Sequence, residues 1–469
     1  MNKTEVQNFQ PSTLTRKILG NSIALFSSQL LAKVFRVVAN FLLARYLGPE
    51  NFGIWTLVLT FTELFRFIPD FGLERTLVRR MARNENRSGL SATLFLRGLF
   101  SGLAILAIWG ALFLTGYNQN VRLFLYLYSL SFFLQSVSGA FSAYFQAQLK
   151  SAALIWAYTA SGVLYLLLVL TGILGQQNTI FFLSALLATE GILLTLFAFT
   201  FFKKGEKLTP FSFGELGPMV KEATPFVVWL GLGTIYYRMD TLLVYHFVGE
   251  KGAGLYAACF RLSEGFLLIA TAAASSLFPV FSRLQTENNK EFVSLFQKSF
   301  FWFFVPAPLI AILIMGLSHS IINFLYGQAF APAAAGLSVI IWSVPFMFAN
   351  ILSTKAIVAC NKETSITKIT ALNLVINLGL NFYLLPRYGF IGACWATVAT
   401  EALNFFLQFL VLQKLLGKKL LTPALPYLLP PAAAGLWFVL HPASFQTAGV
   451  WLFSFGYLTF FLNRKPRLQ

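Results

Sequence analysis

Two stretches, RYLGPENFGIW (Arg45–Trp55) and HFVGEKGAGLY (His246–Tyr256), share a pattern that decides the architecture of this chain. Both read as tight turns between apolar segments, where glycine permits positive φ and close approach of helices. Such turns can coincide by chance, but their position at the end of the first helix of each possible half favours an internal duplication. At a constant offset of 201 residues, the matched positions are Gly48 and Gly249, Gly53 and Gly254, and Trp55 and Tyr256.

The composition outside these turns is that of a membrane protein. Hydrophobic residues make up 57% of the 469 positions, charged residues make up 11%, and the mean hydropathy is +0.70. A water-soluble domain carries about 25% charged residues. We therefore expect lipid to surround most of the surface.

The net charge of +18 does not indicate a nucleic-acid-binding protein. The basic residues lie mostly in short loops between apolar runs, which is the pattern of membrane topology and not of a basic groove. The three cysteines are far apart in apolar runs, and there are three histidines, so we expect no disulfide framework, no metal site and no cofactor.

Fourteen apolar runs approach the length of about 20 residues that a membrane helix needs. The fold class predicted is therefore an all-α polytopic membrane protein of about 14 transmembrane helices. Prolines interrupt the ninth and thirteenth runs, which membrane helices tolerate where neighbours satisfy the freed carbonyls. The runs lie near 18–44, 52–69, 91–115, 122–146, 152–174, 179–202, 223–248, 254–278, 299–325, 333–358, 365–385, 389–412, 423–440 and 445–462.

The distribution of basic residues tests this count through the positive-inside rule. With both termini cytoplasmic, 24 of the 35 lysines and arginines fall on the inner side and 4 on the outer side. One miscounted span would invert every later loop. The first run contains Lys33 and Arg36, so it is expected to be a retained span and not a cleaved signal peptide.

The repeat offset covers six spans, so the two halves run in the same sense, as in parallel-repeat transporters. We expect two six-helix bundles around a central cavity, plus two C-terminal helices. The predicted divisions are 1–202 (spans 1–6), 203–222 (a cytoplasmic linker), 223–412 (spans 7–12) and 413–469 (accessory spans and a cytoplasmic tail).

Charged residues inside the spans are costly and therefore mark a wet cavity, an ion pair or both. Six deep basic residues lie in spans 1, 2, 7, 8 and 10, which predicts a cationic cavity suited to an anionic cargo. Arginine offers a planar fork that binds phosphate oxygens. The six are Lys33, Arg36, Arg66, Arg238, Arg261 and Lys355. A seventh, Arg97, lies near a span end and is expected to snorkel to the interface.

The acidic residues predict local pairing. Glu63, Arg66 and Asp70 share one helical face, and Arg261 and Glu264 form an i,i+3 pair, so a structural ion pair is as reasonable there as a ligand site. Arg238 and Asp240 point to different sides of their helix. Lys33, Arg36 and Lys355 have no local counter-ion, and Glu190, Lys355 and Glu401 are isolated charges.

Uncharged polar ladders accompany these charges. Asn373, Asn377 and Asn381 share a face of span 11, and Gln135 begins a ladder in span 4. Such groups are candidates for contacts with sugars. The alternative is interhelical hydrogen bonding, worth about 0.6 kcal/mol per bond in membranes.

Several motifs resemble the Wzx-type polysaccharide flippases of the multidrug/oligosaccharidyl-lipid/polysaccharide (MOP) exporter superfamily. The resemblance covers the whole chain in order, with a matching number of spans. It is strongest in a Y-x-R-x-D span followed by a G-x-Y turn. The matching stretches are Ala44–Trp55, Pro69–Arg83, Tyr236–Phe266, Leu277–Leu284 and Leu384–Val398.

The resemblance implies a transporter, not an enzyme, in a bacterial inner membrane. Its substrate would be an undecaprenyl-pyrophosphate-linked oligosaccharide, an O-antigen, capsule or exopolysaccharide unit, moved from the cytoplasmic to the periplasmic leaflet by alternating access. Cavity arginines and lysines would hold the pyrophosphate, and Asp70, Asp240 or Glu264 would couple transport to H⁺ or Na⁺. Membrane lipids, a polysaccharide polymerase and a chain-length regulator are the implied partners.

Three alternatives stay open. A lipid II flippase would look physically similar, and a drug/cation antiporter of the same superfamily is expected to have a more acidic cavity. A membrane-embedded polymerase or ligase usually needs a long external loop, and every predicted outer loop here is short.

Overall fold

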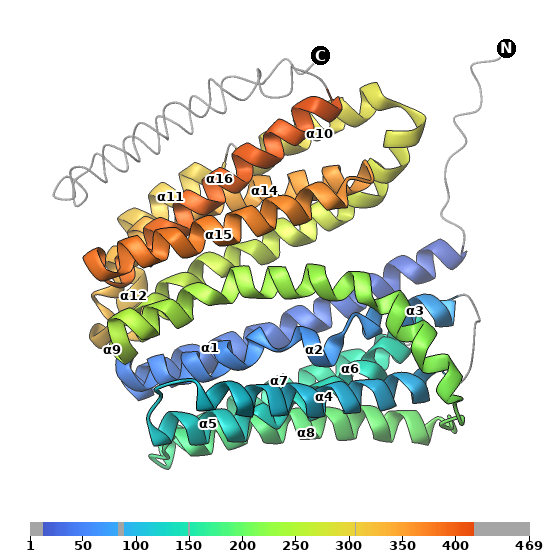
Figure 1. Cartoon of the computed structure of the whole chain (residues 1–469), viewed down its shortest axis with the longest axis horizontal. Coiled ribbons are helices and arrows are strands. Elements are labelled where there is room, and N and C mark those ends of the chain that lie inside the picture. Colours follow the sequence, from blue (N-terminus) through green and yellow to red (C-terminus); the bar gives the residue numbers. More distant parts are fainter. Residues whose placement is uncertain (1–12, 83–88, 149–150, 305, 417–469) are drawn as a thin grey trace. The chain divides into compact units, whose positions relative to one another are not determined.

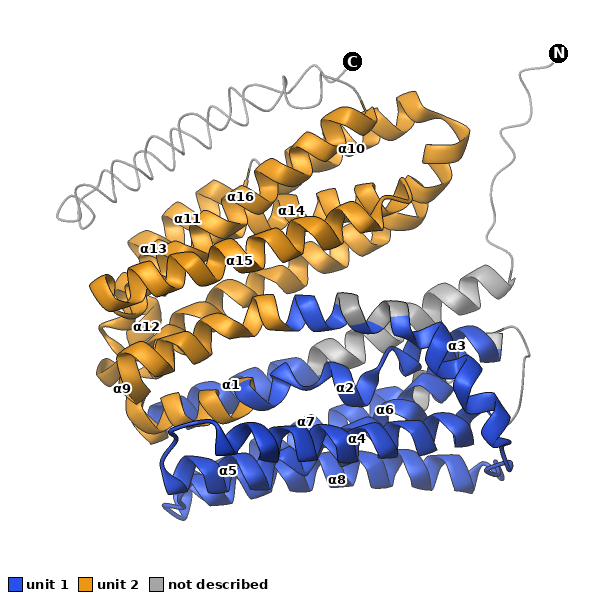
Figure 2. Ribbon diagram, viewed as in Figure 1, with its two compact units in different colours: residues 1–46, 61–234 blue, residues 47–60, 235–469 orange. Residues whose placement is uncertain are grey.

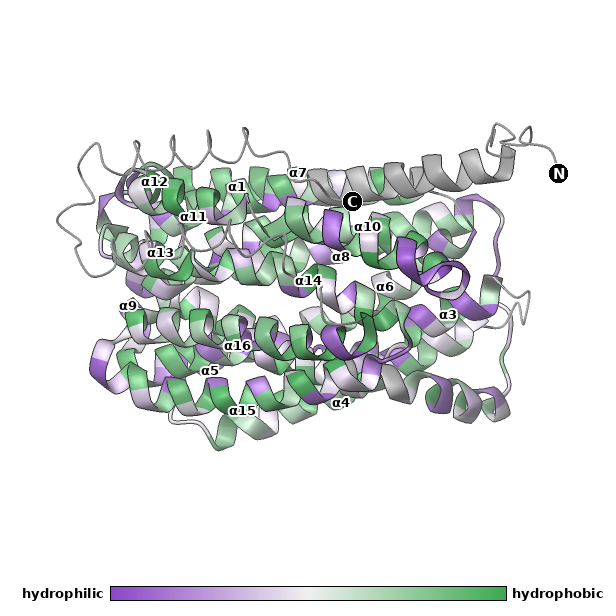
Figure 3. Cartoon of the chain, turned by 90° about the horizontal axis from the view of Figure 1, so that it is seen from above, coloured by the Kyte–Doolittle hydropathy of each residue, from purple (hydrophilic) through white to green (hydrophobic). Residues whose placement is uncertain are grey.

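The computed structural model describes residues 13–82, 89–148, 151–304 and 306–416, and every regular element in these ranges is helical (Figure 1). Nine helices of these ranges are long and apolar enough to cross a membrane, or ten if a pair bent by 41° counts as one span. Colouring by hydropathy shows long apolar stretches in such helices and a largely hydrophilic short helix, α3 (Leu73–Ala82) (Figure 3). The chain is therefore an all-helical multi-pass membrane protein, as the composition predicts.

Two helices are far longer than one membrane crossing. They are α1 (Thr13–Leu64, 52 residues) and α9 (Leu216–Glu287, 72 residues). At about 1.5 Å per residue each exceeds twice the ~30 Å thickness of a bilayer core. Each is kinked at a glycine with positive φ, Gly48 (φ 70°) in α1 and Gly249 (φ 83°) in α9. The predicted spans 1 and 2, and 7 and 8, lie on either side of these kinks.

The first twelve predicted spans coincide with helical parts of the chain, although spans 2, 4, 9 and 10 are each divided over more than one helix. The thirteenth and fourteenth spans, and both chain ends, lie outside the described residues. The count of fourteen and the orientation of the termini therefore remain predictions.

The two glycine turns pack against each other. A Cβ on Gly53 would lie 1.8 Å from the carbonyl oxygen of Glu250, and a Cβ on Gly254 would lie 1.9 Å from that of Pro49. The two contacts are related by the same offset of 201 that relates the sequences. Positive φ at Gly48 and Gly249, and close approach at Gly53 and Gly254, confirm the two roles predicted for these glycines.

The helices cluster into two compact units, coloured separately in Figure 2. Unit 1 comprises Met1–Tyr46 and Phe61–Thr234, and unit 2 comprises Leu47–Thr60 and Ile235–Gln469. Leu47–Thr60 thus belongs with unit 2, where the reciprocal glycine contact holds it to α9. The division into two six-helix bundles and a linker remains a prediction.

Unit 1 is built on antiparallel helices joined by short turns, in which α7 packs on α8, and α6 packs on α3, α4 and α8. One apolar cluster fills the space between them and includes Phe141, Phe145, Phe197 and Phe201. Besides α3 and parts of α1 and α9, the helices are α2 (Phe67–Asp70), α4 (Gly89–Phe113), α5 (Gln119–Ser129), α6 (Ser131–Ala147), α7 (Ser151–Leu174) and α8 (Thr179–Lys203).

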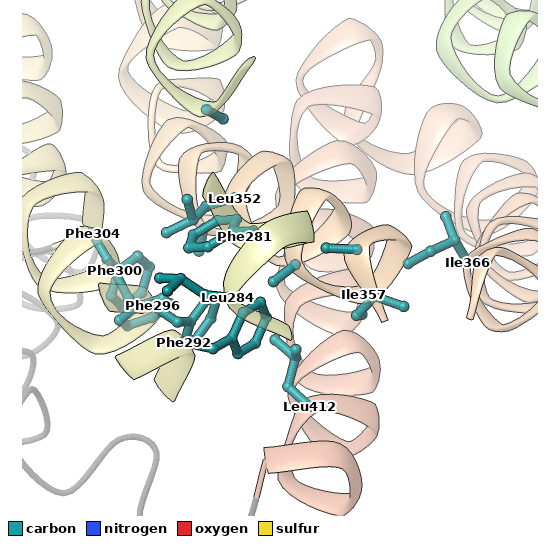
Figure 4. Close-up of a cluster of buried hydrophobic side chains, with 14 residues drawn as sticks. Phe281, Leu284, Phe292, Phe296, Phe300, Phe304, Leu352, Ile357, Ile366 and Leu412 are labelled. Atoms are coloured by element: carbon teal, nitrogen blue, oxygen red, sulfur yellow. The ribbon is translucent and has the colours of Figure 1, made fainter. Parts of the chain in front are cut away.

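Unit 2 is centred on α14, which packs against α10 and α16, while α15 packs along α16. A phenylalanine-rich cluster occupies its interior (Figure 4). Phe281 lies beside Leu352, and the rings of Phe281, Phe292, Phe296 and Phe300 meet in tilted contacts. The helices are α10 (Asn289–Phe304), α11 (Ala307–Gly316), α12 (Ser318–Tyr326), α13 (Ala333–Ile340), α14 (Ser343–Ala359), α15 (Glu363–Tyr388) and α16 (Phe390–Leu416).

Candidate functional site

Unit 1 encloses a cavity of about 660 Å³ lined by side chains from all of its helices. Its lining carries charges of both signs in equal number. The basic residues are Lys33, Arg36, Arg66 and Arg97, and the acidic residues are Glu63, Asp70, Glu74 and Glu190. The cavity is therefore charged but not cationic in sum, and its character depends on which charges are paired.

Arg36 is paired across the cavity wall. Its Nη2 donates to Glu190 Oε1 at 3.1 Å and to Ser161 Oγ at 3.5 Å. The Glu190 side chain is 7% exposed and that of Arg36 37% exposed. Neither residue has a counter-ion on its own helix, as predicted, but α1 and α8, which are distant in sequence, bring the two together, so the charge of Arg36 is not left for an external anion.

Arg97 lies in the interior, not at the interface. It is 5% exposed, its Nη1 lies 3.3 Å from Asp70 Oδ1 and 4.0 Å from Glu74 Oε2, and its Nε donates to Ser136 Oγ at 3.2 Å. Gly139 leaves room for the guanidinium, since a Cβ there would lie 2.6 Å from Arg97 Nη2. The snorkelling prediction is wrong: two carboxylates and a hydroxyl replace the water that an interfacial arginine would seek.

The chain around Arg66 is not one regular helix. Since Pro69 has no N–H to bond the Phe65 carbonyl, Ile68 N donates to that oxygen at 3.0 Å in a tighter three-residue turn. Helix α1 ends at Leu64, and α2 begins at Phe67. The helix that was predicted to carry Glu63, Arg66 and Asp70 on one face is therefore interrupted. All three residues still line the cavity, and Asp70 pairs with Arg97 and not with Arg66.

Two basic side chains that line the cavity are not paired with a carboxylate of the described residues and could therefore bind an anionic ligand. Lys33 and Arg66 are both exposed, and neither has a carboxylate within 4.0 Å among the described residues. Gln135 also lines the cavity, and its Nε2 donates to Ser131 Oγ at 3.3 Å. Five of the predicted site residues thus come together here: Lys33, Arg36, Arg66, Asp70 and Gln135.

The other predicted basic residues lie in unit 2, in smaller groups. Arg238 Nη2 lies 3.5 Å from Glu264 Oε1. Glu264 therefore pairs with Arg238, which precedes the Gly249 kink of α9, and not with Arg261 as predicted. Arg261 instead places its guanidinium over the Phe52 ring at 5.4 Å. The Lys355 ammonium lies over the Phe278 ring at 5.7 Å. These are cation–π contacts that need no acid.

Asp240 is the centre of a buried polar cluster in unit 2. It is 5% exposed and has no basic side chain within 4.0 Å among the described residues. Thr397 Oγ1 donates to its Oδ2 at 2.9 Å, Tyr256 OH to the same oxygen at 3.2 Å, and Asn381 Nδ2 to Oδ1 at 2.9 Å. Helices α9, α15 and α16 converge to supply this set.

The asparagine ladder of α15 is buried and serves this cluster. Asn373, Asn377 and Asn381 are at most 2% exposed, and Asn381 also donates to Asn377 Oδ1 at 3.2 Å. Asn377 Nδ2 donates to Thr400 Oγ1 of α16 at 3.5 Å. Asn377 and Asn381 therefore bond protein groups, while both polar atoms of the Asn373 side chain are buried without a hydrogen bond, and none of the three lines the cavity of unit 1.

A second buried carboxylate, Glu401, has partners that sequence reasoning missed. It is 2% exposed, and it accepts from Tyr236 OH at 3.1 Å and from Asn350 Nδ2 at 2.7 Å. Asn350 lies on α14 and Tyr236 on α9, so both partners come from other helices. The spacing of residues along α16 therefore could not have predicted these hydrogen bonds.

Two cysteines that are far apart in the sequence lie close together in unit 2. The sulfurs of Cys259 and Cys394 are 4.0 Å apart and both residues are free. In the described part of the chain, no group of three histidine, cysteine or acidic side chains could hold a metal ion.

Comparison with protein families places this chain among glycan-related membrane proteins. The family described as polysaccharide biosynthesis protein matches residues 18–285, and the MatE family matches residues 225–383. The first match covers more than half of the chain.

Two curated relatives come from the archaeon Haloferax volcanii. The probable low-salt glycan biosynthesis flippase Agl15 is 23% identical over 404 residues, covering 83% of this chain and 82% of the relative. The probable flippase AglR is 27% identical over 197 residues, covering 38% of each chain.

Solved structures share the fold at low identity. The lipid II flippase MurJ in an inward closed conformation superposes with a TM-score of 0.70 at 13% identity, covering 95% of this chain and 99% of that one. An inward-facing multidrug resistance MATE family transporter of the MOP superfamily gives a TM-score of 0.68 at 13% identity, covering 84% and 98%. The fold is therefore MurJ- and MATE-like.

Proposed function

Because the chain belongs to the polysaccharide biosynthesis protein family of the MOP superfamily, we propose that it is a flippase that moves a lipid-linked oligosaccharide across a membrane. The membership confirms the family resemblance inferred from the sequence, and this family comprises transporters, not enzymes. Agl15 and AglR, both named as probable flippases, support the same activity here.

The proposal depends on one observation. Two exposed basic side chains, Lys33 and Arg66, line the cavity of unit 1, whereas the other two basic side chains there form ion pairs. Arg36 and Arg97 are bound by Glu190, Asp70 and Glu74. Lys33 and Arg66 provide the charge for an anionic head group, and Arg66 offers the fork geometry that phosphate prefers.

An anionic lipid head needs such a site to cross. Moving a bare ion into a low-dielectric medium costs of the order of 20 kcal/mol. Each charge-assisted hydrogen bond returns roughly 1.5–3 kcal/mol. Basic side chains in a wet cavity therefore lower the barrier by replacing the water around the phosphate. Gln135, which also lines the cavity, would contact a sugar hydroxyl.

We further propose the finer assignment made from the sequence. The carrier lipid is undecaprenyl pyrophosphate, and its sugar is an O-antigen, capsule or exopolysaccharide unit moved from the cytoplasmic to the periplasmic leaflet of a bacterial inner membrane. Both chain ends face the cytoplasm, and two six-helix bundles alternate access to the cargo. The positive-inside distribution of basic residues supports this orientation.

Asp240 is the carboxylate that couples this movement to Na⁺ or H⁺. Unlike Asp70 and Glu264, which face Arg97 and Arg238, it has no cation beside it in the described part of unit 2. The Asn381 Oδ1 atom is buried and accepts no hydrogen bond. Carboxylate, hydroxyl and amide oxygens are the ligands that hard cations prefer.

The test is flipping in proteoliposomes by variants of the two exposed cations. The probe is a fluorescent polyprenyl-pyrophosphate-linked sugar, and the readout is the rate at which it reaches the opposite leaflet. Lys33→Gln and Arg66→Gln each lower the rate by about tenfold or more, since one charge-assisted contact is worth roughly 1.5–3 kcal/mol. Lys203→Gln, an exposed lysine at the end of α8 outside the cavity, leaves the rate unchanged. Wild-type flipping by the Lys33→Gln/Arg66→Gln double variant refutes the site.

A further inference from the structure

We propose that Glu401 is a proton-binding site of unit 2, coupled to Asp240 through a buried polar network, so that a negative charge on one carboxylate favours protonation of the other. The inference deepens the proposed function and rests on it only for the role of the proton in transport. The placement of Glu401 is independent of any substrate.

The surroundings of Glu401 contain neutral donors only. Tyr236 OH approaches Oε1 at 3.1 Å, and Asn350 Nδ2 approaches both Oε2 at 2.7 Å and the Glu401 carbonyl oxygen at 3.1 Å. No lysine or arginine of the described residues lies within 4.0 Å of the carboxylate. Two neutral hydrogen bonds do not compensate for burying a full charge that is 2% exposed, so a proton is the simplest neutralising partner.

One partner of Glu401 has an unused acceptor. Asn350 is 5% exposed, and its Oδ1 is buried without a hydrogen bond while its Nδ2 serves Glu401 twice. A protonated carboxyl group carries an O–H donor. Rotation of the Asn350 amide would then give that donor an acceptor, so the pair can satisfy both charge states.

A network of buried polar side chains lies between the two carboxylates. Asp240 accepts from Asn381, Asn381 donates to Asn377, and Asn377 donates to Thr400. Thr400 lies beside the Tyr236 hydroxyl, which donates to Glu401. Every member is buried, so the negative charge at either end raises the cost of negative charge at the other.

The other ionisable groups around Glu401 do not supply a cation. From α9, Tyr236, Tyr237 and Asp240 face it, and α13 carries no ionisable side chain. On α14, Lys355 directs its ammonium to Phe278. The charged residues of α15 lie near its ends, at Glu363, Lys368 and Arg387.

Infrared spectroscopy of the full-length protein tests the site without a transport assay. The expected result is a protonated-carboxyl stretching band that disappears as pH rises. This band is absent from Glu401→Gln and present in Asp240→Asn with a changed pH dependence. Tyr236→Phe, which removes one donor to the carboxylate and preserves the ring, retains the band to higher pH. Persistence of the whole band in Glu401→Gln, or an unchanged pH dependence in both other variants, overturns the proposal.

A transport arm separates this inference from the proposed function. In proteoliposomes with an imposed proton gradient, wild-type flipping responds to the gradient, and Glu401→Gln flips without that response. A response in Glu401→Gln equal to that of wild type overturns the role of the proton. If wild type fails to flip any lipid-linked sugar, the flippase proposal fails, while the infrared titration still decides whether Glu401 binds a proton.

Discussion

Adding one methyl group at Gly53 or Gly254 tests the contact that joins the two glycine turns. The new Cβ would lie 1.8 Å from Glu250 O in Gly53→Ala and 1.9 Å from Pro49 O in Gly254→Ala. Real Cβ atoms stay beyond 3.0 Å, so the backbones must separate by about 1.2 Å at the first site. Neither carbonyl can rotate away as a side chain does, because both belong to the backbone of kinked helices.

The expected cost lies at or beyond the upper end of the usual overpacking range, about 3 kcal/mol or more for each variant. Because both methyl groups open the same contact, the double variant costs less than the sum of the two. Denaturant unfolding in detergent, followed by tryptophan fluorescence, measures both quantities.

The matched control is Gly265→Ala in α9, whose Cβ would meet nothing within 4 Å. Alanine there is expected to be neutral or to stabilise the helix by about 0.5–1 kcal/mol. The reasoning is refuted if Gly53→Ala and Gly265→Ala unfold within about 0.5 kcal/mol of each other, the spread of an ordinary surface substitution.

Three further substitutions probe separate parts of the structure. Arg97→Met leaves Asp70 and Glu74 without their cation and is expected to destabilise unit 1 by about 3–5 kcal/mol in the same unfolding assay, whereas an interfacial arginine would cost little. Gly48→Ala meets no atom but must adopt φ near 70°, so its cost is about 1–2 kcal/mol; a cost as large as that of Gly53→Ala would contradict this assignment of causes. Asp240→Asn removes the charge and keeps one acceptor oxygen for the donors of the cluster, so flipping should persist without stimulation by a sodium or proton gradient. Undiminished stimulation would exclude Asp240 as the coupling group.

The elements of this fold were accessible from sequence because membrane helices are specified by long apolar runs. The kinks were also predictable, since Gly48 and Gly249 are surrounded by matching turns at a fixed offset. The membership of Leu47–Thr60 in unit 2 was not, because it depends on a contact between backbones 201 residues apart.

The ion pairs of the site were largely missed. Spacing along one helix predicted partners for Arg66 and Arg261, yet the pairs that form are Arg36 with Glu190 and Arg238 with Glu264. An ion pair between two helices depends on how each helix is rotated about its axis and how far the two are shifted along each other. Neither quantity can be predicted from the residue spacing of a single sequence. Pro69 was the one available signal that the helix around Arg66 would break.

The location of the lipid-linked oligosaccharide in cells tests the central claim most directly. After deletion of the gene, spheroplasts are probed with an impermeant reagent that reacts with the sugar on the outer leaflet. The account predicts that the lipid-linked oligosaccharide accumulates on the inner leaflet, and that wild type, but not the Lys33→Gln/Arg66→Gln variant, restores its outer exposure. Unchanged outer exposure in the deletion strain would contradict the flippase function.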